Sequence, residues 1–317
     1  MTKSQDITGV ILAAGKSTRM QPFSARFPKP ILPICNRPVI EYQIEEMKRL
    51  GIEDIIIVVG HLGFEVSLAL GDGSRLGVNI RYVDQRDTMG IAHAVGQLEP
   101  YINHRFLLFL GDIFFKTKDL QDMLTLMDEG AHAVLAVRRE ESLEAIGRNF
   151  AVVIDEDHRV RRVIEKPRHP PNKIKGCGLY LFDPHIFDAI RRTPQTAGRN
   201  EYELTSSIQL LIEDDFAVRI AEVVTYDINL TFPQDLLTCN LKQLGFLGQE
   251  SLIGESCHLH PDVKVINSVI GDGVTVAQPI EIRDSLILSD SVVTYRGDLN
   301  RIIFTPDSII DCRLMER

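Results

Sequence analysis

The sequence predicts an α/β protein with a mostly parallel sheet, followed by a smaller domain of short repeated strands. Two observations predict the first part. Apolar runs at residues 10–12, 55–59 and 106–110 have the continuous hydrophobicity of strands buried on both faces, and segments of helical periodicity alternate with them. A six-residue apolar repeat that begins at Leu252 predicts the second part, because such repeats form the coils of a β-helix.

The elements of the first part follow one another in chain order. A helix over residues 38–50 has Pro38 at a favourable first position and ends at Gly51. The charged segment 139–148 is expected to lie on the surface. Further strands are expected at residues 79–83, 131–137, 151–154, 160–164 and 218–224, and further helices at 64–70, 91–101, 120–127, 201–212 and from 231 onward.

A loop of small residues follows the first strand. Ala14 and Gly15 have no side chain that would hold a ligand away from the backbone, so successive N–H groups can turn toward an anion. Arg19 adds a planar fork of donors, and Lys29 is held between two prolines that restrict its backbone. The pattern predicts a phosphate-binding loop; the alternative is an ordinary βα loop with two solvated cations.

Polar residues follow other strands at the edge where ligands bind in open α/β sheets. Gln85 follows one strand, and Gly90 opens the helix after it. Asp112 lies at the tip of an apolar strand, where a carboxylate must be solvated, paired or bound to a metal. Asp227 ends a later strand directly before a helix, so helix-start electrostatics is the alternative there.

The segments AAGKSTRM, FPKP and NRPVIEY, which lie within residues 13–43, together resemble the signature of the sugar-1-phosphate nucleotidylyltransferases. This family joins a nucleoside triphosphate to a sugar 1-phosphate and releases pyrophosphate. The resemblance continues through GIAHAV, L-G-D, E-K-P and G-L-Y, covers roughly residues 9–247, and is greatest for the thymidylyltransferase branch. It implies a Rossmann-like catalytic domain with a mixed, mostly parallel sheet over residues 1–248.

The resemblance also implies a role for each matching residue. Arg19 and Lys29 would face the triphosphate and stabilise the leaving pyrophosphate, and Lys166 would hold the sugar phosphate. Asp112 and Asp227 would bind Mg²⁺ as the cofactor. The remaining residues placed around the nucleotide and the sugar are Leu12, Ala14, Gly15, Gln85, Gly90, Glu165, Asn172 and Gly178. A surface ion pair is the alternative for Glu165 with Lys166, and a turn-forming role is the alternative for Asn172.

Three departures from the family pattern loosen the expected choice of sugar. Ile113 follows the aspartate where most members have Asn or His, Ala151 replaces a glycine, and Ser206 replaces an aspartate. A glutamine amide at Gln85 can pair with thymine or uracil, and guanine shows a comparable edge. We expect dTTP, or UTP, with glucose 1-phosphate; the alternatives are GTP with mannose 1-phosphate and a non-catalytic sugar-nucleotide sensor or assembly subunit.

The repeat after Leu252 predicts a left-handed β-helix over residues 249–317. Its apolar positions recur every six residues apart from one step of five, which amounts to little more than two coils. The resemblance to longer nucleotidylyltransferases implies an assembly or regulatory element and a homo-oligomer. Acyl transfer is a weaker alternative, for which His258 and His260 are the candidates.

Composition narrows the class of partner. The net charge of −9 lacks the excess of cations that a general nucleic-acid binder needs. Five cysteines without a C-x-x-C pair predict reduced thiols. The first residues lack an apolar signal segment, and no apolar run approaches 18 residues. We therefore expect a cytoplasmic protein with small-molecule substrates and no contact with nucleic acid or membrane.

Overall fold

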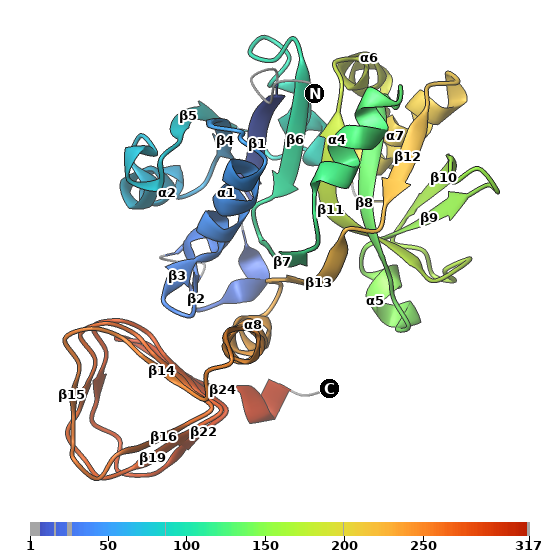
Figure 1. The fold of residues 1–317 in the computed structure, drawn as a ribbon. Coiled ribbons are helices and arrows are strands. Elements are labelled where there is room, and N and C mark those ends of the chain that lie inside the picture. Colours follow the sequence, from blue (N-terminus) through green and yellow to red (C-terminus); the bar gives the residue numbers. More distant parts are fainter. Residues whose placement is uncertain (1–6, 16, 24–26, 86, 199, 316–317) are drawn as a thin grey trace. The chain divides into compact units, whose positions relative to one another are not determined.

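The computed structural model describes residues 7–15, 17–23, 27–85, 87–198 and 200–315. The chain forms two compact units (Figure 1), of which the first comprises Met1–Gly15 and Tyr42–Asp227 and the second Lys16–Glu41 and Ile228–Arg317. The division predicted after residue 248 separates the β-helix alone. The second compact unit also includes residues 16–41 and the helix that precedes the β-helix.

A nine-stranded mixed sheet forms the centre of unit 1, with the strand order β10-β9-β11-β6-β1-β4-β5; β8 pairs with β11, and β12 pairs with β8. This is the Rossmann-like arrangement that the sequence predicts. The strands are β1 (Ile7–Ala13), β4 (Asp54–Val59), β5 (Asn79–Asp84), β6 (Arg105–Leu110), β8 (Ala133–Arg139), β9 (Phe150–Ile154), β10 (Val160–Glu165), β11 (Ile174–Phe182) and β12 (Val218–Ala221).

One half of this sheet is parallel and the other is not. β1 pairs in parallel with β4 and β6, and β4 with β5, so these strands all end at one edge. At that edge Leu12 lies opposite both Val58 and Leu110. β11 instead runs antiparallel to β6, β8 and β9. The mixed character arises at β11, because this strand runs opposite to all three of the strands with which it pairs.

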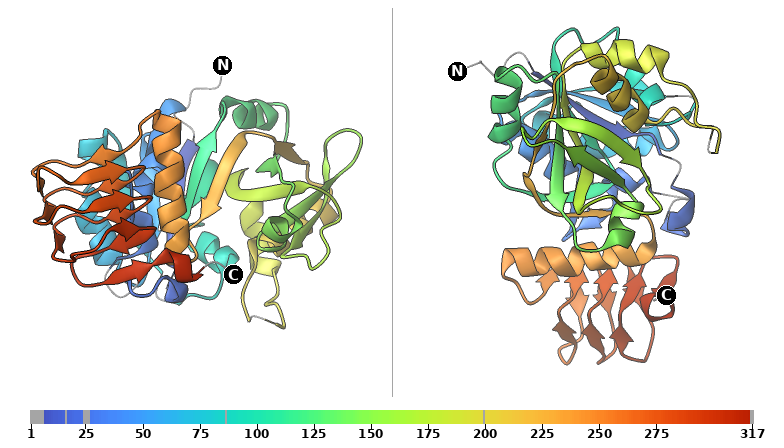
Figure 2. Two further views of the ribbon diagram at one scale, coloured as in Figure 1. Left: turned by 90° about the horizontal axis from the view of Figure 1, so that it is seen from below. Right: turned by 90° about the vertical axis from the view of Figure 1, so that its right-hand side faces the viewer.

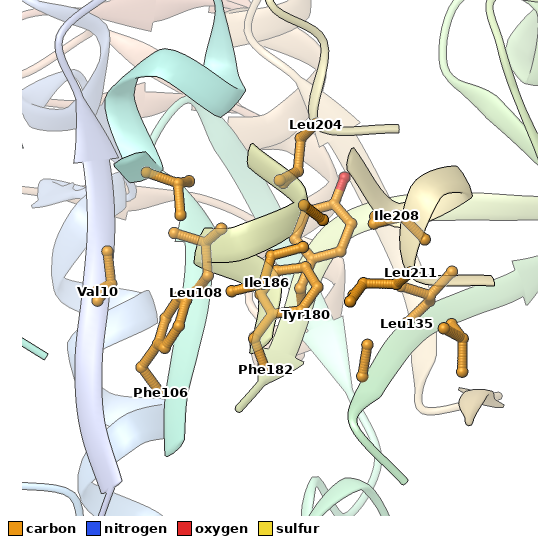
Figure 3. Packing of buried hydrophobic residues seen from close by; sticks show 14 of the residues in the cluster. Val10, Phe106, Leu108, Leu135, Tyr180, Phe182, Ile186, Leu204, Ile208 and Leu211 are labelled. Carbon is orange, nitrogen blue, oxygen red and sulfur yellow. The ribbon is translucent and has the colours of Figure 1, made fainter. Parts of the chain in front are cut away.

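Helices cover both faces of the sheet. On one face α3, α6 and α7 enclose the apolar cluster drawn in Figure 3, in which the rings of Tyr180 and Phe182 are stacked and the rings of Phe106 and Phe182 are tilted against each other. On the other face α1 and α4 pack, and α1 approaches so closely that a Cβ at Gly9 would lie 2.6 Å from Met47 Sδ. The helices are α1 (Val39–Arg49), α2 (Gly63–Leu70), α3 (Ile91–Gly96), α4 (Gln121–Asp128), α6 (His185–Arg192) and α7 (Leu204–Glu213).

Several segments differ from the sequence-based expectation, and three of them are as follows. The helix expected over 91–101 ends at Gly96 and continues as turns. The charged segment 139–148 contains the short helix α5 (Leu143–Gly147), whose first turn is capped because Ser142 Oγ accepts from the Ala145 N–H. The strand β7 (Ile113–Thr117), which pairs with β13 (Val224–Asn229), was not expected, because it follows β6 without a turn-forming residue other than Gly111.

In unit 2 the hairpin of β2 (Pro33–Ile34) and β3 (Arg37–Pro38) rests on α8 (Pro233–Leu247). The fully buried Asn240 of α8 joins them: its Nδ2 donates to the Pro33 carbonyl at 3.0 Å, and its Oδ1 accepts from the Cys35 N–H at 2.7 Å. The helix begins with a cap from Asp235, whose carboxylate accepts from the backbone N–H groups of Thr231 and Phe232.

Three coils of short parallel strands follow α8, which runs alongside them in the direction in which they stack (Figure 2). Each coil takes 17 residues, since Leu252 pairs with Val269 and Val269 with Leu286. The expectation of little more than two coils is wrong, because the step of five recurs in each coil, and the repeat then continues in register to residues 299–304. The strands are β14 (Leu252–Ile253), β15 (His258–Leu259), β16 (Lys264–Ile266), β17 (Val269–Ile270), β18 (Thr275–Val276), β19 (Glu281–Arg283), β20 (Leu286–Ile287), β21 (Val292–Val293) and β22 (Leu299–Asn300), with β23 (Ile302–Phe304) and the antiparallel β24 (Ile309–Asp311) at the end.

The 17-residue period is visible in polar residues as well. The serines at 251, 268 and 285 form a ladder in which each hydroxyl accepts from a backbone N–H of the next coil. One corner of each coil has a residue with positive φ, at Asn267, Asp284 and Arg301. All five cysteines are free thiols, as predicted. In the part of the chain that the structure describes, no helix is both long enough and apolar enough to cross a membrane.

Candidate functional site

The loop after β1 is bordered by glycines on both neighbouring strands. The Gly111 N–H donates to the Leu12 carbonyl at 2.9 Å, and a Cβ at Gly111 would lie 2.7 Å from that oxygen. A Cβ at Gly60 would lie 3.0 Å from the Ala14 carbonyl oxygen. A Cβ at Gly15 would meet no described atom within 4 Å. The end of β1 is therefore packed closely from the sides, while Gly15 is exposed.

Asp112 follows this contact directly and is half-buried. Its backbone position is fixed from α1, where Gln43 Nε2 donates to the carbonyls of Leu110 and Ile113 at 2.9 and 2.8 Å. Gln43 is 2% exposed, and a buried amide must find such partners. The structure thus identifies Gln43 as a positioning residue that the sequence analysis did not select.

The predicted base-binding residues lie at the end of β5. Gln85 is buried, and its Nε2 donates to the Asp87 carbonyl at 3.0 Å and lies 3.2 Å from His93 Nδ1. Gly90 has φ 111°, and a Cβ there would lie 2.4 Å from the Tyr202 carbonyl oxygen. Gly90 is therefore required by the close approach of another backbone, and the Gln85 amide is oriented by its own loop.

Glu165 and Lys166 lie at the end of β10. Lys166 Nζ is 3.3 Å from Glu165 Oε1, and Thr205 Oγ1 donates to Glu165 Oε2 at 3.1 Å. Burial raises the pKa of Glu165; the Lys166 ammonium opposes this shift, and the nearby Glu203 carboxylate reinforces it. Lys166 has φ 42°, a conformation that is uncommon for a lysine. A strained backbone at a predicted substrate residue is compatible with a functional role.

Asn172 and Gly178 have local structural roles. Asn172 Nδ2 donates to the Val152 carbonyl at 2.8 Å, and its Oδ1 accepts from the Ile174 N–H at 2.9 Å. These contacts match the turn-forming alternative. Gly178 has φ 69°, and a Cβ there would lie 2.6 Å from Ile113 Cδ1. The residue that departs from the family pattern after Asp112 therefore packs against Gly178.

Arg19 and Lys29 belong to unit 2. The Arg19 guanidinium carbon lies 5.8 Å from the centre of the Phe232 ring, within the range of a cation–π contact. Lys29 opens the 3₁₀ turn Lys29–Ile31, and its neighbour Pro28 has an extended conformation. An extended backbone was expected on both sides of Lys29. Pro28 has this conformation, whereas Pro30 lies within the 3₁₀ turn.

The Asp227 carboxylate contacts two cationic side chains. Lys175 Nζ lies 2.8 Å from Oδ1 and 2.6 Å from Oδ2 of Asp227. Arg138 Nε lies 2.6 Å from Oδ1 as an ion pair, without the alignment of a hydrogen bond. The side chains of Asp227 and Lys175 are 0% and 3% exposed. The Asp227 carboxylate thus has two cationic partners within the protein.

A model of the family described as nucleotidyl transferase matches residues 8–223. The chain belongs to this family. The match covers β1, the loop after it and every predicted site residue except Asp227, which lies beyond its last residue. Membership in the nucleotidyl transferase family is thus shown by the first unit and by the segment 16–41.

Similar proteins come from several organisms. A nucleotidyltransferase of low-salt glycan biosynthesis, Agl11 of Haloferax volcanii, is 34% identical over 235 residues, which are 73% of this chain and 64% of Agl11. A glucose-1-phosphate thymidylyltransferase of Streptomyces antibioticus is 29% identical and is covered to 80% by a match that spans 88% of this chain. A solved structure of UDP-glucose pyrophosphorylase with UDP-glucose superposes with a TM-score of 0.67 at 21% identity, over 75% of this chain and 98% of that one.

The two predicted metal ligands of this nucleotidyl transferase differ in their surroundings. β7 and β13 pair so that the Lys118 N–H meets the Val223 carbonyl and Thr225 Oγ1 meets the Lys116 carbonyl, which brings the start of β7, next to Asp112, toward Asp227. A carboxylate ligand of Mg²⁺ must offer an oxygen to the ion. Both oxygens of Asp227 already contact cations. Asp227 therefore does not fit the predicted role, whereas Asp112 remains compatible with it.

Another group of potential metal ligands lies at the opposite end of β8 and β11. Ligand atoms of His132, Asp183 and His185 lie within 4.8 Å of one another. These potential ligand atoms already have partners nearby. Asp183 Oδ1 accepts from the His185 backbone N–H and lies 3.0 Å from the His185 ring Nδ1. His132 Nδ1 accepts from the Ala217 N–H. The Asp183 contacts lie at the start of α6, and the His132 contact joins the segments before β8 and β12.

Three residues of the site were not selected from the sequence: Gln43, Thr205 and Lys175. Each is a polar residue, and each is buried. A lysine inside the apolar strand Ile174–Phe182 is the clearest such signal, because lysine is almost never fully buried unless it is paired. Polar residues at core positions would have identified all three as members of buried networks.

Proposed function

We propose that this protein transfers a nucleotidyl group from a nucleoside triphosphate to a sugar 1-phosphate and releases pyrophosphate. The proposed substrates are dTTP, with UTP as the second choice, and glucose 1-phosphate. GTP with mannose 1-phosphate stays an alternative, because the departures at Ile113, Ala151 and Ser206 affect the sugar side.

The observation that carries this proposal is the packing at the end of β1. Gly60 and Gly111 allow two neighbouring strands to approach the backbone of Leu12 and Ala14, while Gly15 is exposed. Backbone N–H groups at such a strand end bind phosphate. Names of similar proteins support the same class, since they include a glucose-1-phosphate thymidylyltransferase and a UTP–glucose-1-phosphate uridylyltransferase.

The proposed reaction needs positioning and charge more than covalent chemistry. An oxygen of the sugar phosphate attacks the α-phosphorus, a new P–O bond forms, and the bond to the bridging oxygen of the β-phosphate breaks. Arg19 and Lys29 would neutralise the charge that develops on the leaving pyrophosphate. Lys166 would hold the attacking phosphate, and Glu165 would accept hydrogen bonds from sugar hydroxyls.

One observation favours a second candidate, a non-catalytic subunit that binds sugar nucleotides. The Asp227 carboxylate is neutralised by Lys175 and Arg138 and does not offer the second oxygen ligand that the resemblance implies. A subunit that has lost turnover would still bind the nucleotide through the loop after β1. Binding without pyrophosphate release would distinguish this candidate.

The test is a substrate panel that crosses dTTP, UTP and GTP with glucose 1-phosphate and mannose 1-phosphate. Pyrophosphate release is measured with a coupled phosphate assay, with and without Mg²⁺. We expect release with dTTP or UTP and glucose 1-phosphate. Nucleotide binding by calorimetry in the absence of release would instead support the sensor subunit.

A matched pair of lysine variants tests the site. Lys166→Met should reduce kcat/KM by roughly a hundredfold, because a charge on the reacting phosphate is lost. Lys173→Met is the control: Lys173 is on the same connection but is 56% exposed and pairs with Glu141. Equal activities of the two variants would contradict the role of Lys166.

A further inference from the structure

The starting point is the way in which Lys175 is held. It lies in β11, opposite Arg138 of β8 and Ala151 of β9, so the strand is paired on both sides. The next residue, Gly176, lies under the Phe150 ring, whose nearest carbon would be 1.9 Å from an added Cβ. The backbone that carries Lys175 is thus fixed by two neighbouring strands and an aromatic ring.

The ion-pair partner of the Lys175 side chain is the Asp227 carboxylate. The ammonium lies 2.6 and 2.8 Å from the two oxygens of Asp227, and both side chains are buried. An ammonium has three donors and no acceptor, so Lys175 meets both Asp227 oxygens as a cation. Arg138, the other cation, is balanced by Glu140 as well.

A divalent ion at Asp227 would have to enter beside these cations. Charges of the same sign a few ångströms apart in a partly buried site repel each other strongly. Moving Lys175 away would leave a buried ammonium without its partner, which is costly. The surroundings of Asp227 therefore favour the bound lysine over a metal ion.

We propose that the Lys175 ammonium is a fixed cation that takes the place of a metal ion at Asp227. Of the two predicted metal ligands, Asp112 is then the one that we propose as a ligand of a divalent ion. The inference uses the location of the predicted site and so rests on the proposed function for its biological meaning. What it claims directly is which of the two aspartates binds a divalent ion.

Direct measurement of Mn²⁺ binding tests the proposal without turnover. Free Mn²⁺ is followed by electron paramagnetic resonance during titration of the full-length protein. Asp227→Asn should change the Kd by less than about twofold, whereas Asp112→Asn should weaken binding by about tenfold, since only the latter removes a ligand. Lys175→Met should bind Mn²⁺ about tenfold more tightly than the wild type, because a second carboxylate becomes available.

The double variant Lys175→Met with Asp227→Asn should return to the wild-type Kd, and Lys173→Met should not differ from it. Weaker binding by Asp227→Asn comparable to that by Asp112→Asn would overturn the proposal. So would a Lys175→Met protein that is folded by circular dichroism yet binds Mn²⁺ no more tightly. If Lys175→Met does not fold, Lys175→Gln, which keeps a donor and most of the length, takes its place with the same expected gain.

The outcomes separate this inference from the proposed function. Absence of pyrophosphate release with every substrate pair would contradict the enzymatic proposal and leave the Mn²⁺ pattern unaffected. Conversely, an active enzyme whose Mn²⁺ binding depends on Asp227 would overturn the role of Lys175 alone.

Discussion

Each unit of this protein contains a buried polar centre, and the two centres are built differently. In unit 1 the centre is charged: Asp227 is held by Lys175 and Arg138. In unit 2 it is neutral: Asn240 of α8 hydrogen-bonds to the backbone of Pro33, Cys35 and its own helix. Both central side chains are fully buried.

The charged centre and the neutral centre therefore have different effects on the segments around them. A buried ion pair costs desolvation and is not itself good evidence of stability, but breaking it by removing one partner is strongly destabilising. A neutral amide with all its partners costs less to bury and fixes one geometry. The charged centre thus controls which ions can approach the sheet, while the neutral centre fixes the hairpin Pro33–Pro38 to α8.

The largest expected effect separates the two members of the charged pair. Asp227→Asn should reduce the free energy of unfolding by about 3–5 kcal/mol, because it leaves the buried Lys175 ammonium without its partner. Lys175→Met should also be destabilising but less so, because Arg138 still contacts the Asp227 carboxylate. The double variant should lose much less than the sum. Urea unfolding of all four proteins gives the coupling energy, and additive losses would show that the contact is not energetically important.

A smaller loss is expected at the neutral centre. Asn240→Ala should reduce the free energy of unfolding by about 2 kcal/mol, since the Cys35 N–H and the Pro33 carbonyl lose their partner. Asn79→Ala is the control, because its amide bonds to Asp54 on the surface and surface substitutions usually change stability by less than about 0.5 kcal/mol. If Asn240→Ala and Asn79→Ala lost equal free energies of unfolding in urea, the buried amide would be no more important for stability than the surface amide.

The serine ladder of the β-helix should be less sensitive. Ser285 is buried, its hydroxyl donates to the Arg283 carbonyl at 2.6 Å, and it accepts from the Ile302 N–H at 3.1 Å. Ser285→Ala should therefore cost about 1 kcal/mol. Thermal unfolding measures this cost, with Ser67→Ala as the control because the Ser67 hydroxyl is on the surface of α2. If Ser285→Ala lost no stability, water would have replaced the hydrogen bonds of the serine ladder.

The smallest effect concerns pH. Burial raises the pKa of Glu165 above its ordinary value of 4.5, so the folded protein binds this proton more tightly than the unfolded chain does. Stability contributed by the protonated form is full below 4.5 and is lost as the pH rises through the folded-state pKa. Glu165→Gln should flatten this decline. Melting temperatures of both proteins between acidic and neutral pH measure the difference, and parallel curves would contradict the shift.

Much of the fold could be predicted because it depends on local patterns. Continuous apolar runs identified β1, β4 and β6, and the apolar repeat identified the β-helix. The antiparallel placement of β11 could not be predicted, since hydrophobicity is the same for either direction of a buried strand. The number of coils was wrong because a step of five was counted as an irregularity, although it recurs once per coil.

For the site, the sequence by itself predicted a phosphate-binding loop and determined the membership in the nucleotidyl transferase family, since each motif consists of residues that are close together in the chain. Only the tertiary structure decided the state of Asp227. Its partners Arg138 and Lys175 are far away in sequence and become neighbours through the pairing of β8 with β11. Whether a carboxylate is available to a metal ion depends on the charges beside it, and these come from strands whose pairing the sequence does not display.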